Sequence, residues 1–141
     1  MTRPDPYAGF RFLVEIDGVA SAGFTEVSGL SAGIEPVDYR EGSDRGAARK
    51  LPGLRKFDDV TLKRGFTANR DLWDWFKSGL DGAVQRRTVR IILLGEDRTP
   101  VGRWILREAW ISRWEGPHLA TGGSDVAMET IVLVHEGLDF E

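Results

Sequence analysis

The clearest signal in this chain lies near its N-terminus, in the stretch that reads Phe10-Arg11-Phe12-Leu13-Val14-Glu15-Ile16-Asp17-Gly18. Its side chains alternate, so that Phe10, Phe12, Val14 and Ile16 share one face. A period of two residues is typical of a β-strand with one face on a core. The pair Asp17-Gly18 favours a tight turn. The stretch therefore predicts a half-buried strand that ends in a turn.

Further segments with strand character follow along the chain, separated by glycine-rich turns. They span residues 23–28, 35–39, 60–63, 88–94, 101–114 and 126–134. In the long stretch 101–114, the large apolar side chains Trp104, Leu106, Trp110 and Trp114 all fall at even positions. The stretch 126–134 carries apolar residues on both faces, which predicts burial on both sides.

Only one segment has the signals of a helix. Thr67 or Asn69 can cap it, Asp71 suits its first turn, and Gly79 and Gly82 favour its end. Its apolar stripe consists of Leu72, Trp73, Trp75 and Phe76. A helix of about 10 residues is unstable alone, so it must dock on a sheet. With about seven strands and no βαβ alternation, the pattern predicts a mainly β fold. We expect a curled antiparallel β-barrel or sandwich with one short α-helix packed on its side.

The stretch from Arg40 to Lys56 has neither helical nor strand periodicity. Within it, Leu51-Pro52-Gly53-Leu54 predicts a turn between two exposed leucines. Long irregular stretches are either functional or mobile surface loops, and the residues alone leave both readings open. Residues 1–8 contain two prolines and predict a flexible arm. The length favours a single domain over residues 1–141.

Composition narrows the possible functions. The chain has 41% hydrophobic and 29% charged residues, which is ordinary for a globular protein. It has no cysteine, so disulfides and thiolate chemistry are excluded. The net charge of -3 supplies no overall field for nucleic acid, and we expect no specific nucleic-acid binding. The N-terminus lacks the apolar run of a signal peptide, and no stretch predicts a membrane segment, so we expect synthesis in the cytoplasm.

Catalytic and ligand-binding motifs are weak. Residues 29–33 form a literal G-x-S-x-G around Ser31, but the following residues contain Pro36 and read as extended rather than helical. The two histidines, His118 and His135, match no zinc spacing. No glycine-rich phosphate loop occurs. The basic pairs at residues 49–50, 55–56 and 63–64 have acidic neighbours, which favours an interface or solvated face. We therefore expect no catalytic residue, no cofactor and no metal.

A set of segments in fixed order extends over nearly the whole chain, from Tyr7 to Leu138. Besides residues 10–18, they read Phe24-Thr25-Glu26-Val27-Ser28-Gly29-Leu30, Tyr39-Arg40-Glu41-Gly42, Arg49-Lys50-Leu51-Pro52-Gly53-Leu54, Thr61-Leu62-Lys63-Arg64-Gly65, Leu72-Trp73-Asp74-Trp75-Phe76, Ala109-Trp110, Trp114-Glu115-Gly116-Pro117 and His135-Glu136-Gly137-Leu138. In this order and spacing they resemble the tail tube proteins of contractile phages and of the related extracellular contractile injection systems.

The resemblance implies a structural subunit rather than an enzyme, similar to the secreted tube protein of type VI secretion. In such proteins six subunits form a ring whose sheets join into one barrel, and the rings stack inside a contractile sheath. It implies partners for this chain: further copies of itself, a sheath protein, baseplate, spike and tube-terminator proteins, and cargo in the lumen. It also implies an inter-subunit role for the stretch 40–56. The expected contact residues are Tyr39, Arg40, Glu41, Gly42, Arg49, Lys50, Leu51, Pro52, Gly53 and Leu54.

Three other readings remain open on the sequence. The first is a tube-initiator or baseplate-proximal relative with the same fold. The second is a carbohydrate-binding β-sandwich that uses some of the five tryptophans, and the third is an esterase that uses Ser31. Under the tube reading, the protein functions in an assembled phage tail or injection particle.

Overall fold

The computed structural model describes residues 11–19, 23–40, 42, 46, 49–123 and 126–141. The expected flexible arm at residues 1–8 lies outside the described residues. The elements are β1 (Arg11–Ile16), β2 (Phe24–Ser28), β3 (Ala32–Tyr39), β4 (Arg49–Phe57), β5 (Val60–Gly65), α1 (Asp71–Leu80), β6 (Arg87–Leu94), β7 (Pro100–Glu115), β8 (Met128–Val134) and β9 (Gly137–Phe140).

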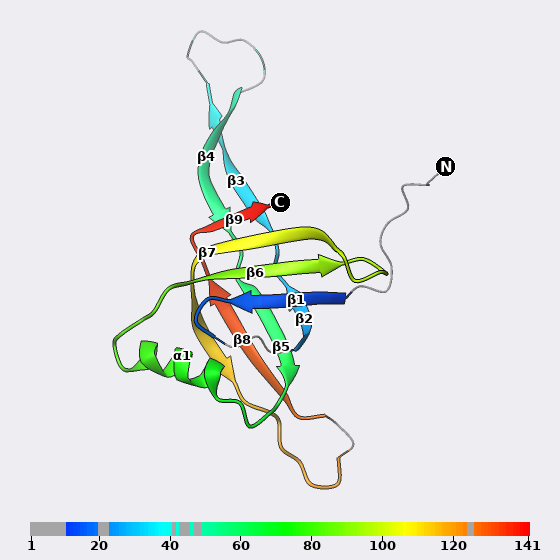
Figure 1. Cartoon of the computed structure of the whole chain (residues 1–141). Coiled ribbons are helices and arrows are strands. Elements are labelled where there is room, and N and C mark those ends of the chain that lie inside the picture. Colours follow the sequence, from blue (N-terminus) through cyan, green and yellow to red (C-terminus); the bar gives the residue numbers. More distant parts are fainter. Residues whose placement is uncertain (1–10, 20–22, 41, 43–45, 47–48, 124–125) are drawn as a thin grey trace.

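The strands form one curled sheet and one separate hairpin (Figure 1). The curled sheet has the order β1-β6-β7-β8-β5-β2, with β9 paired to β7, while β3 and β4 pair only with each other. Every pairing of named strands is antiparallel. The prediction of a mainly β, antiparallel fold with one short helix on its side is confirmed. β1 and β2 are the two ends of the path and do not pair in the described part of the chain, so the curled sheet is not a closed barrel.

The long strand β7 connects the two halves of the curled sheet. Its first part pairs with β6 and β9, and its last part pairs with β8. The pairing shifts register near Glu108, which has a positive φ of 53°, and again next to Ile111. Such bulges bend a strand and change which side chains face inward. The predicted even-numbered face is therefore interrupted: Leu106, Ala109 and Ile111 are buried, while Trp110 is only half-buried.

The core lies between the curled sheet and α1. Its most deeply buried apolar side chains include Val60, Leu62, Val89, Leu106, Ile131 and Leu133. From α1, Leu72 and Trp75 join the same cluster, which confirms that the helix docks on the sheet. The Trp75 indole donates a hydrogen bond of 2.7 Å to the backbone oxygen of Gln85, so the indole nitrogen has a partner although the side chain is buried.

The start and end of α1 differ in detail from the prediction. Arg70 occupies the N-cap position without a side-chain cap, but the Asn69 side chain accepts a hydrogen bond of 2.9 Å from the Asp71 N–H. Gly79 lies inside the helix rather than after it. Gly82, with a φ of +91°, follows the last turn, in a conformation that favours glycine.

A buried ion pair connects the middle of the sheet to the segment before α1. Arg64 on β5 and Glu129 on β8 are almost fully buried, and their Nε and Oε2 atoms lie 2.8 Å apart. The Trp114 indole donates to the other Glu129 oxygen at 2.7 Å, and Arg64 also donates to the backbone oxygen of Asn69 at 3.4 Å. Arg64 is therefore a core residue, and it is not available to the surface basic cluster considered from the sequence.

The C-terminal strands differ from the prediction in two ways. The strand expected at 126–134 begins at Met128, and only Glu129, Ile131 and Leu133 on it are fully buried. Its other face is half-buried, so the prediction of full burial on both sides is wrong. The short strand β9 was not predicted. It pairs with the first part of β7, which places the C-terminus beside the sheet.

Candidate assembly interface

β3 and β4 form a two-stranded ribbon, which we call the arm, and it projects from one end of the body (Figure 1). Residues 49–56, predicted as irregular, belong to β4, so that prediction is wrong for the second half of the stretch 40–56. Every residue of β3 is exposed, and so is every residue of β4 except Phe57. Alternation arises when one face of a strand is buried. Because residues 49–56 of β4 bury neither face in the single chain, their sequence shows none.

The arm exposes an unusual amount of apolar surface. Its large exposed apolar side chains are Ile34, Val37, Tyr39, Leu51 and Leu54, the last of them 75% exposed. Val37 faces Leu51 across the ribbon, and Tyr39 faces Arg49. A lone two-stranded hairpin is marginally stable in water, and contiguous exposed apolar patches mark interaction sites. The arm therefore has the features of a surface that becomes covered on assembly.

The predicted turn at Leu51–Leu54 lies inside β4, so the turn prediction is wrong. The ladder shifts register between Ile34 and Pro36, whose partners Arg55 and Pro52 have Gly53 and Leu54 between them, as expected for a β-bulge. A Cβ atom at Gly53 would lie only 2.6 Å from the backbone oxygen of Glu35 and 2.7 Å from a methyl group of Val37. Only glycine fits at this position.

Charged side chains flank the apolar residues of the arm. Lys50 and Asp38 form an exposed ion pair with 3.2 Å between Nζ and Oδ1. Arg40 and Arg49 have no ion-pair partner among the described residues. Of the other expected contact residues, Gly42 is exposed and Glu41 lies outside the described part of the chain.

The base of the arm is held to the body at Asp58, between β4 and β5. The Ser31 hydroxyl donates a hydrogen bond to the Asp58 carboxylate, and the Asp58 N–H donates one of 3.2 Å to the backbone oxygen of Ser31. The ring nitrogens of His135 lie 3.0 Å from the backbone oxygens of Asp58 and Gly137. The His135 ring also lies 5.6 Å from the ring of Phe57. These contacts connect the end of β8 to the point where the arm leaves the body.

The same contacts account for the G-x-S-x-G motif without catalysis. Ser31 donates to a carboxylate rather than to His135, and both ring nitrogens of that histidine face backbone oxygens. In a serine hydrolase of this motif the serine is hydrogen-bonded to a histidine that a carboxylate orients, and His135 contacts neither the Ser31 hydroxyl nor the Asp58 carboxylate. Gly29 has a φ of +92°, and a Cβ there would lie 2.0 Å from the Asp59 oxygen. The first glycine therefore belongs to a tight backbone turn.

The remaining features do not form a site of chemistry. Within the described residues, no group of three or more His, Cys, Asp or Glu side chains could hold a metal ion. In the same residues, no helix has the length and apolar character needed to cross a membrane. A hydrogen bond from the Thr99 side chain lowers the pKa of Asp97, which lies in the exposed turn between β6 and β7.

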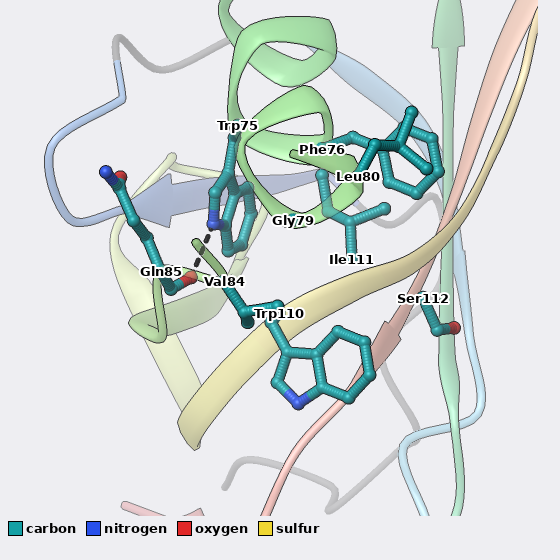
Figure 2. A pocket seen from close by; sticks show the side chains of 9 residues that line it. All are labelled: Trp75, Phe76, Gly79, Leu80, Val84, Gln85, Trp110, Ile111 and Ser112. Atoms are coloured by element: carbon teal, nitrogen blue, oxygen red, sulfur yellow. Dashed lines mark hydrogen bonds between the residues drawn. The ribbon is translucent and has the colours of Figure 1, made fainter. Parts of the chain in front are cut away.

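A small pocket of about 160 Å³ lies between α1 and β7 (Figure 2). Its lining is mostly apolar and includes Phe76, Leu80, Val84 and Trp110. The pocket contains no charged residue, and it brings together none of the expected contact residues.

None of the five tryptophans is fully exposed, and the four besides Trp75 are half-buried. Trp73 contacts Trp114 edge-on with ring centroids 4.8 Å apart, and Trp104 contacts Phe140 at 5.2 Å. Trp75 is buried. Sugar-binding tryptophans would present a free ring face, so these contacts disfavour the carbohydrate-binding reading.

In the part of the chain that the structure describes, each end strand of the curled sheet is paired along one edge, and the arm buries neither face. These are features of a structural subunit whose partners are other protein chains. The comparisons with known proteins agree with this class. The family model described as T4-like virus tail tube protein gp19 matches residues 8–139. The chain belongs to this family of structural tail tube proteins, and it is not an enzyme.

Solved structures extend the comparison. The chain is 25% identical to a protein in the sheath–tube complex of an extracellular contractile injection system (PVC) in its extended state, with a TM-score of 0.86 and coverage of 98% of this chain and 93% of that one. In the sheath/tube terminator structure of the same system, a chain matches with 25% identity, a TM-score of 0.88 and 99% coverage of both chains. Hcp1 from Flavobacterium johnsoniae shares the fold, at 11% identity, a TM-score of 0.61 and coverage of 92% and 93%. No curated protein sequence matches the chain.

Proposed function

We propose that this protein forms the inner tube of a contractile injection system or contractile phage tail, as stacked rings of six subunits around a lumen. The observation that carries the proposal is the arm, which exposes five large apolar side chains on a ribbon with no covered face. Its contact residues are those expected from the sequence: Tyr39, Arg40, Glu41, Gly42, Arg49, Lys50, Leu51, Pro52, Gly53 and Leu54. Membership of the tail tube family supports the assembly class.

Ring closure would use the two free ends of the curled sheet. Among the described residues, the outer edges of β1 and β2 pair with no further strand, and natural proteins cover such edges to avoid uncontrolled pairing. Pairing of β2 of one copy with β1 of the next would satisfy both edges. A head-to-tail contact of this kind closes into a ring when the rotation between copies fits a whole number of subunits.

The proposed partners outside the tube are a sheath protein, a baseplate and spike, a tube terminator and cargo in the lumen. Similarity to chains in sheath–tube, baseplate and terminator structures of injection particles supports the first three. In this proposal, shortening of the sheath drives the tube through the envelope of a target cell. The protein would work in the assembled particle after synthesis in the cytoplasm.

Negative-stain electron microscopy of the purified chain over a concentration series tests the proposal. We expect hollow six-fold rings at low concentration and tubes of constant width at high concentration. If only dispersed monomers form at every concentration, purified baseplate is added as a nucleus. Continued absence of rings and tubes would overturn the proposal.

A second function within the same family is the short initiating ring next to the baseplate. One observation favours it: a chain from the baseplate structure of the anti-feeding prophage is 26% identical, with a TM-score of 0.82 and coverage of 100% of this chain and 97% of that one. The microscopy separates the two, because an initiator forms single rings that do not elongate without a second tube protein.

A further inference from the structure

The arm has two long outer edges that its own hairpin does not cover. β3 has eight residues and β4 has nine, and in the described part of the chain each pairs only with the other. The outer edge of a strand presents N–H and C=O groups to any other strand, so a long exposed edge is prone to uncontrolled pairing. Exposed apolar side chains such as Val37 and Leu54 increase that tendency. The arms of two free subunits are therefore expected to pair edge to edge unless something prevents it.

Two prolines lie directly opposite each other near the middle of the arm. Pro36 on β3 is the partner of Pro52 on β4. In an antiparallel ladder, opposite residues alternate between pairs that exchange two N–H···O hydrogen bonds and pairs whose N–H groups point outward. Proline has no N–H, so this pair cannot be of the first kind. The two proline nitrogens therefore face the two outer edges, one on each side of the arm.

Each outer edge consequently lacks a hydrogen-bond donor at this position. A strand that approached the edge would meet the ring carbons of proline in place of an N–H group, and its own carbonyl oxygen would stay without a partner. The next outward-facing pair along the arm is Asp38 with Lys50, because the two kinds of pair alternate. These two side chains form the ion pair of 3.2 Å. Charged side chains, lysine above all, also disfavour edge pairing.

The β-bulge of the arm lies beside the proline pair. The ladder shifts register between Ile34 and Pro36, and on β4 the residues Gly53 and Leu54 lie within the shift. A bulge twists a strand and interrupts the regular spacing that a further strand needs. The prolines, the charges and the bulge therefore interrupt both edges near their middle, which leaves only short runs of regular edge on either side.

We propose that Pro36 and Pro52 act as a pair of edge blocks. They prevent the arm of a free subunit from pairing, strand to strand, with the arm of a second copy, and each proline protects one edge. The arm can then expose apolar side chains without joining uncontrolled sheets. This role goes beyond the proposed function and does not depend on it, because unwanted pairing threatens a free subunit in any assembly.

Replacement of the prolines by a β-forming residue that has an N–H tests the proposal. In the double variant Pro36→Thr with Pro52→Thr, both edges regain a donor. At concentrations where the unmodified chain stays dispersed, we expect this variant to form extended aggregates that bind thioflavin T. Its threshold concentration for association should fall by about tenfold, which is the change expected from one or two regained backbone hydrogen bonds.

The single variants test the assignment of one proline to each edge. One open edge allows two copies to pair once, which closes a dimer, whereas two open edges allow pairing to continue. In analytical ultracentrifugation, Pro36→Thr and Pro52→Thr alone should therefore stop at dimers, while the double variant continues to larger species.

The matched control is Gly33→Thr, which places the same β-forming residue on the same ribbon without adding an N–H donor. A Cβ at Gly33 meets nothing within 4 Å, so the ribbon should tolerate it. The control should stay as dispersed as the unmodified chain. Pro36→Ala with Pro52→Ala repeats the test with the donors restored and a residue of lower β-propensity, in case threonine disturbs the arm.

Two results would overturn the proposal. If both double variants stay as dispersed as Gly33→Thr, the prolines stiffen the arm but do not block its edges. If the unmodified chain itself forms aggregates that bind thioflavin T at the same concentrations, its edges are not blocked. Either result leaves the proposed tube function standing, because that function is judged by rings and tubes in the electron microscope.

Discussion

At the scale of single residues, Arg64 and Glu129 are the buried charged side chains of the described chain, and they pair with each other. Each charge is removed from water, and its partner supplies the compensating charge 2.8 Å away. Loss of one member leaves the other charge buried without compensation, which is far more costly than loss of both. The Trp114 indole also depends on Glu129 as its acceptor.

We predict that Glu129→Leu lowers the free energy of unfolding by about 3–5 kcal/mol, because Arg64 is left as an uncompensated buried charge. The double variant Arg64→Met with Glu129→Leu should lose much less. Urea denaturation of the monomer, followed by tryptophan fluorescence, measures both. Equal losses in the single and double variants would mean that the two side chains do not act as a pair.

A substitution at Gly53 tests the role of the arm without changing a residue of the core. In Gly53→Ala, the new methyl group meets the Glu35 oxygen and a Val37 methyl group at less than 3 Å. Overpacking of this kind costs about 1–3 kcal/mol, and here the cost falls on the arm rather than the core. We expect the concentration needed for assembly to rise between several-fold and about a hundredfold, with no change in unfolding of the body.

Light scattering over a concentration series measures the Gly53→Ala effect. Gly33→Ala is the matched control, since Gly33 lies on the same ribbon and a Cβ there meets nothing within 4 Å. If both variants assemble like the unmodified chain, the bulge at Gly53 is not needed for the contact.

At the scale of elements, the arm is separable from the body. The buried cluster contains residues of β1, β2, β5, β6, β7, β8 and α1 but none of β3 or β4. The base contacts of Ser31, Asp58 and His135 lie outside the two strands. An element that shares no core with its body opens without unfolding it.

We predict that replacing residues 34–55 with a short glycine-rich turn abolishes assembly and changes the free energy of unfolding of the body by less than about 1 kcal/mol. Urea denaturation and electron microscopy measure the two effects. Collapse of the folded body would show that the arm is part of its core.

In the unmodified chain, arm amides should exchange fast with D₂O in the monomer and slowly in the tube, and equal protection in both states would contradict an assembly role.

At the scale of the whole molecule, the protein presents two free sheet edges, an arm at one end and exposed apolar residues at the other. All of these surfaces would be covered only by other chains. The rings of Trp73, Trp104 and Trp114, in contrast, pack against other aromatic rings of the same subunit. Assembly, rather than binding of a small ligand, is therefore the function that the surface favours.

We predict that mono- and oligosaccharides leave the tryptophan fluorescence of the monomer unchanged, because Trp75 is buried and Trp73, Trp104 and Trp114 pack against other aromatic rings. Assembly should change the emission, since Trp110 and Trp104 are half-buried and their surroundings alter when edges are covered. Saturable quenching by a sugar in the monomer would restore the carbohydrate-binding reading.

Local sequence patterns were sufficient to predict the mainly β class and the docked helix. They also marked residues 40–56 as unlike the rest of the chain. Alternation reports burial of one strand face, and a stripe such as Leu72, Trp75 and Phe76 reports burial of one helix face. Both signals arise between near neighbours in the chain. Residues 49–56 stood out for the opposite reason, since a strand that buries neither face carries no pattern.

Pairing between strands that are far apart in the sequence could not be predicted from such local patterns. Three features depend on the register between distant strands. They are the ribbon of β3 and β4, the change of the inward face at the bulge near Glu108 in β7, and the contact between Arg64 and Glu129. Moving a register by one residue reverses which side chains face the core, and a single sequence does not encode that choice locally. Composition and periodicity therefore determine the class and the exposed stretch, while packing between distant strands determines the arm, the bend and the buried charge pair.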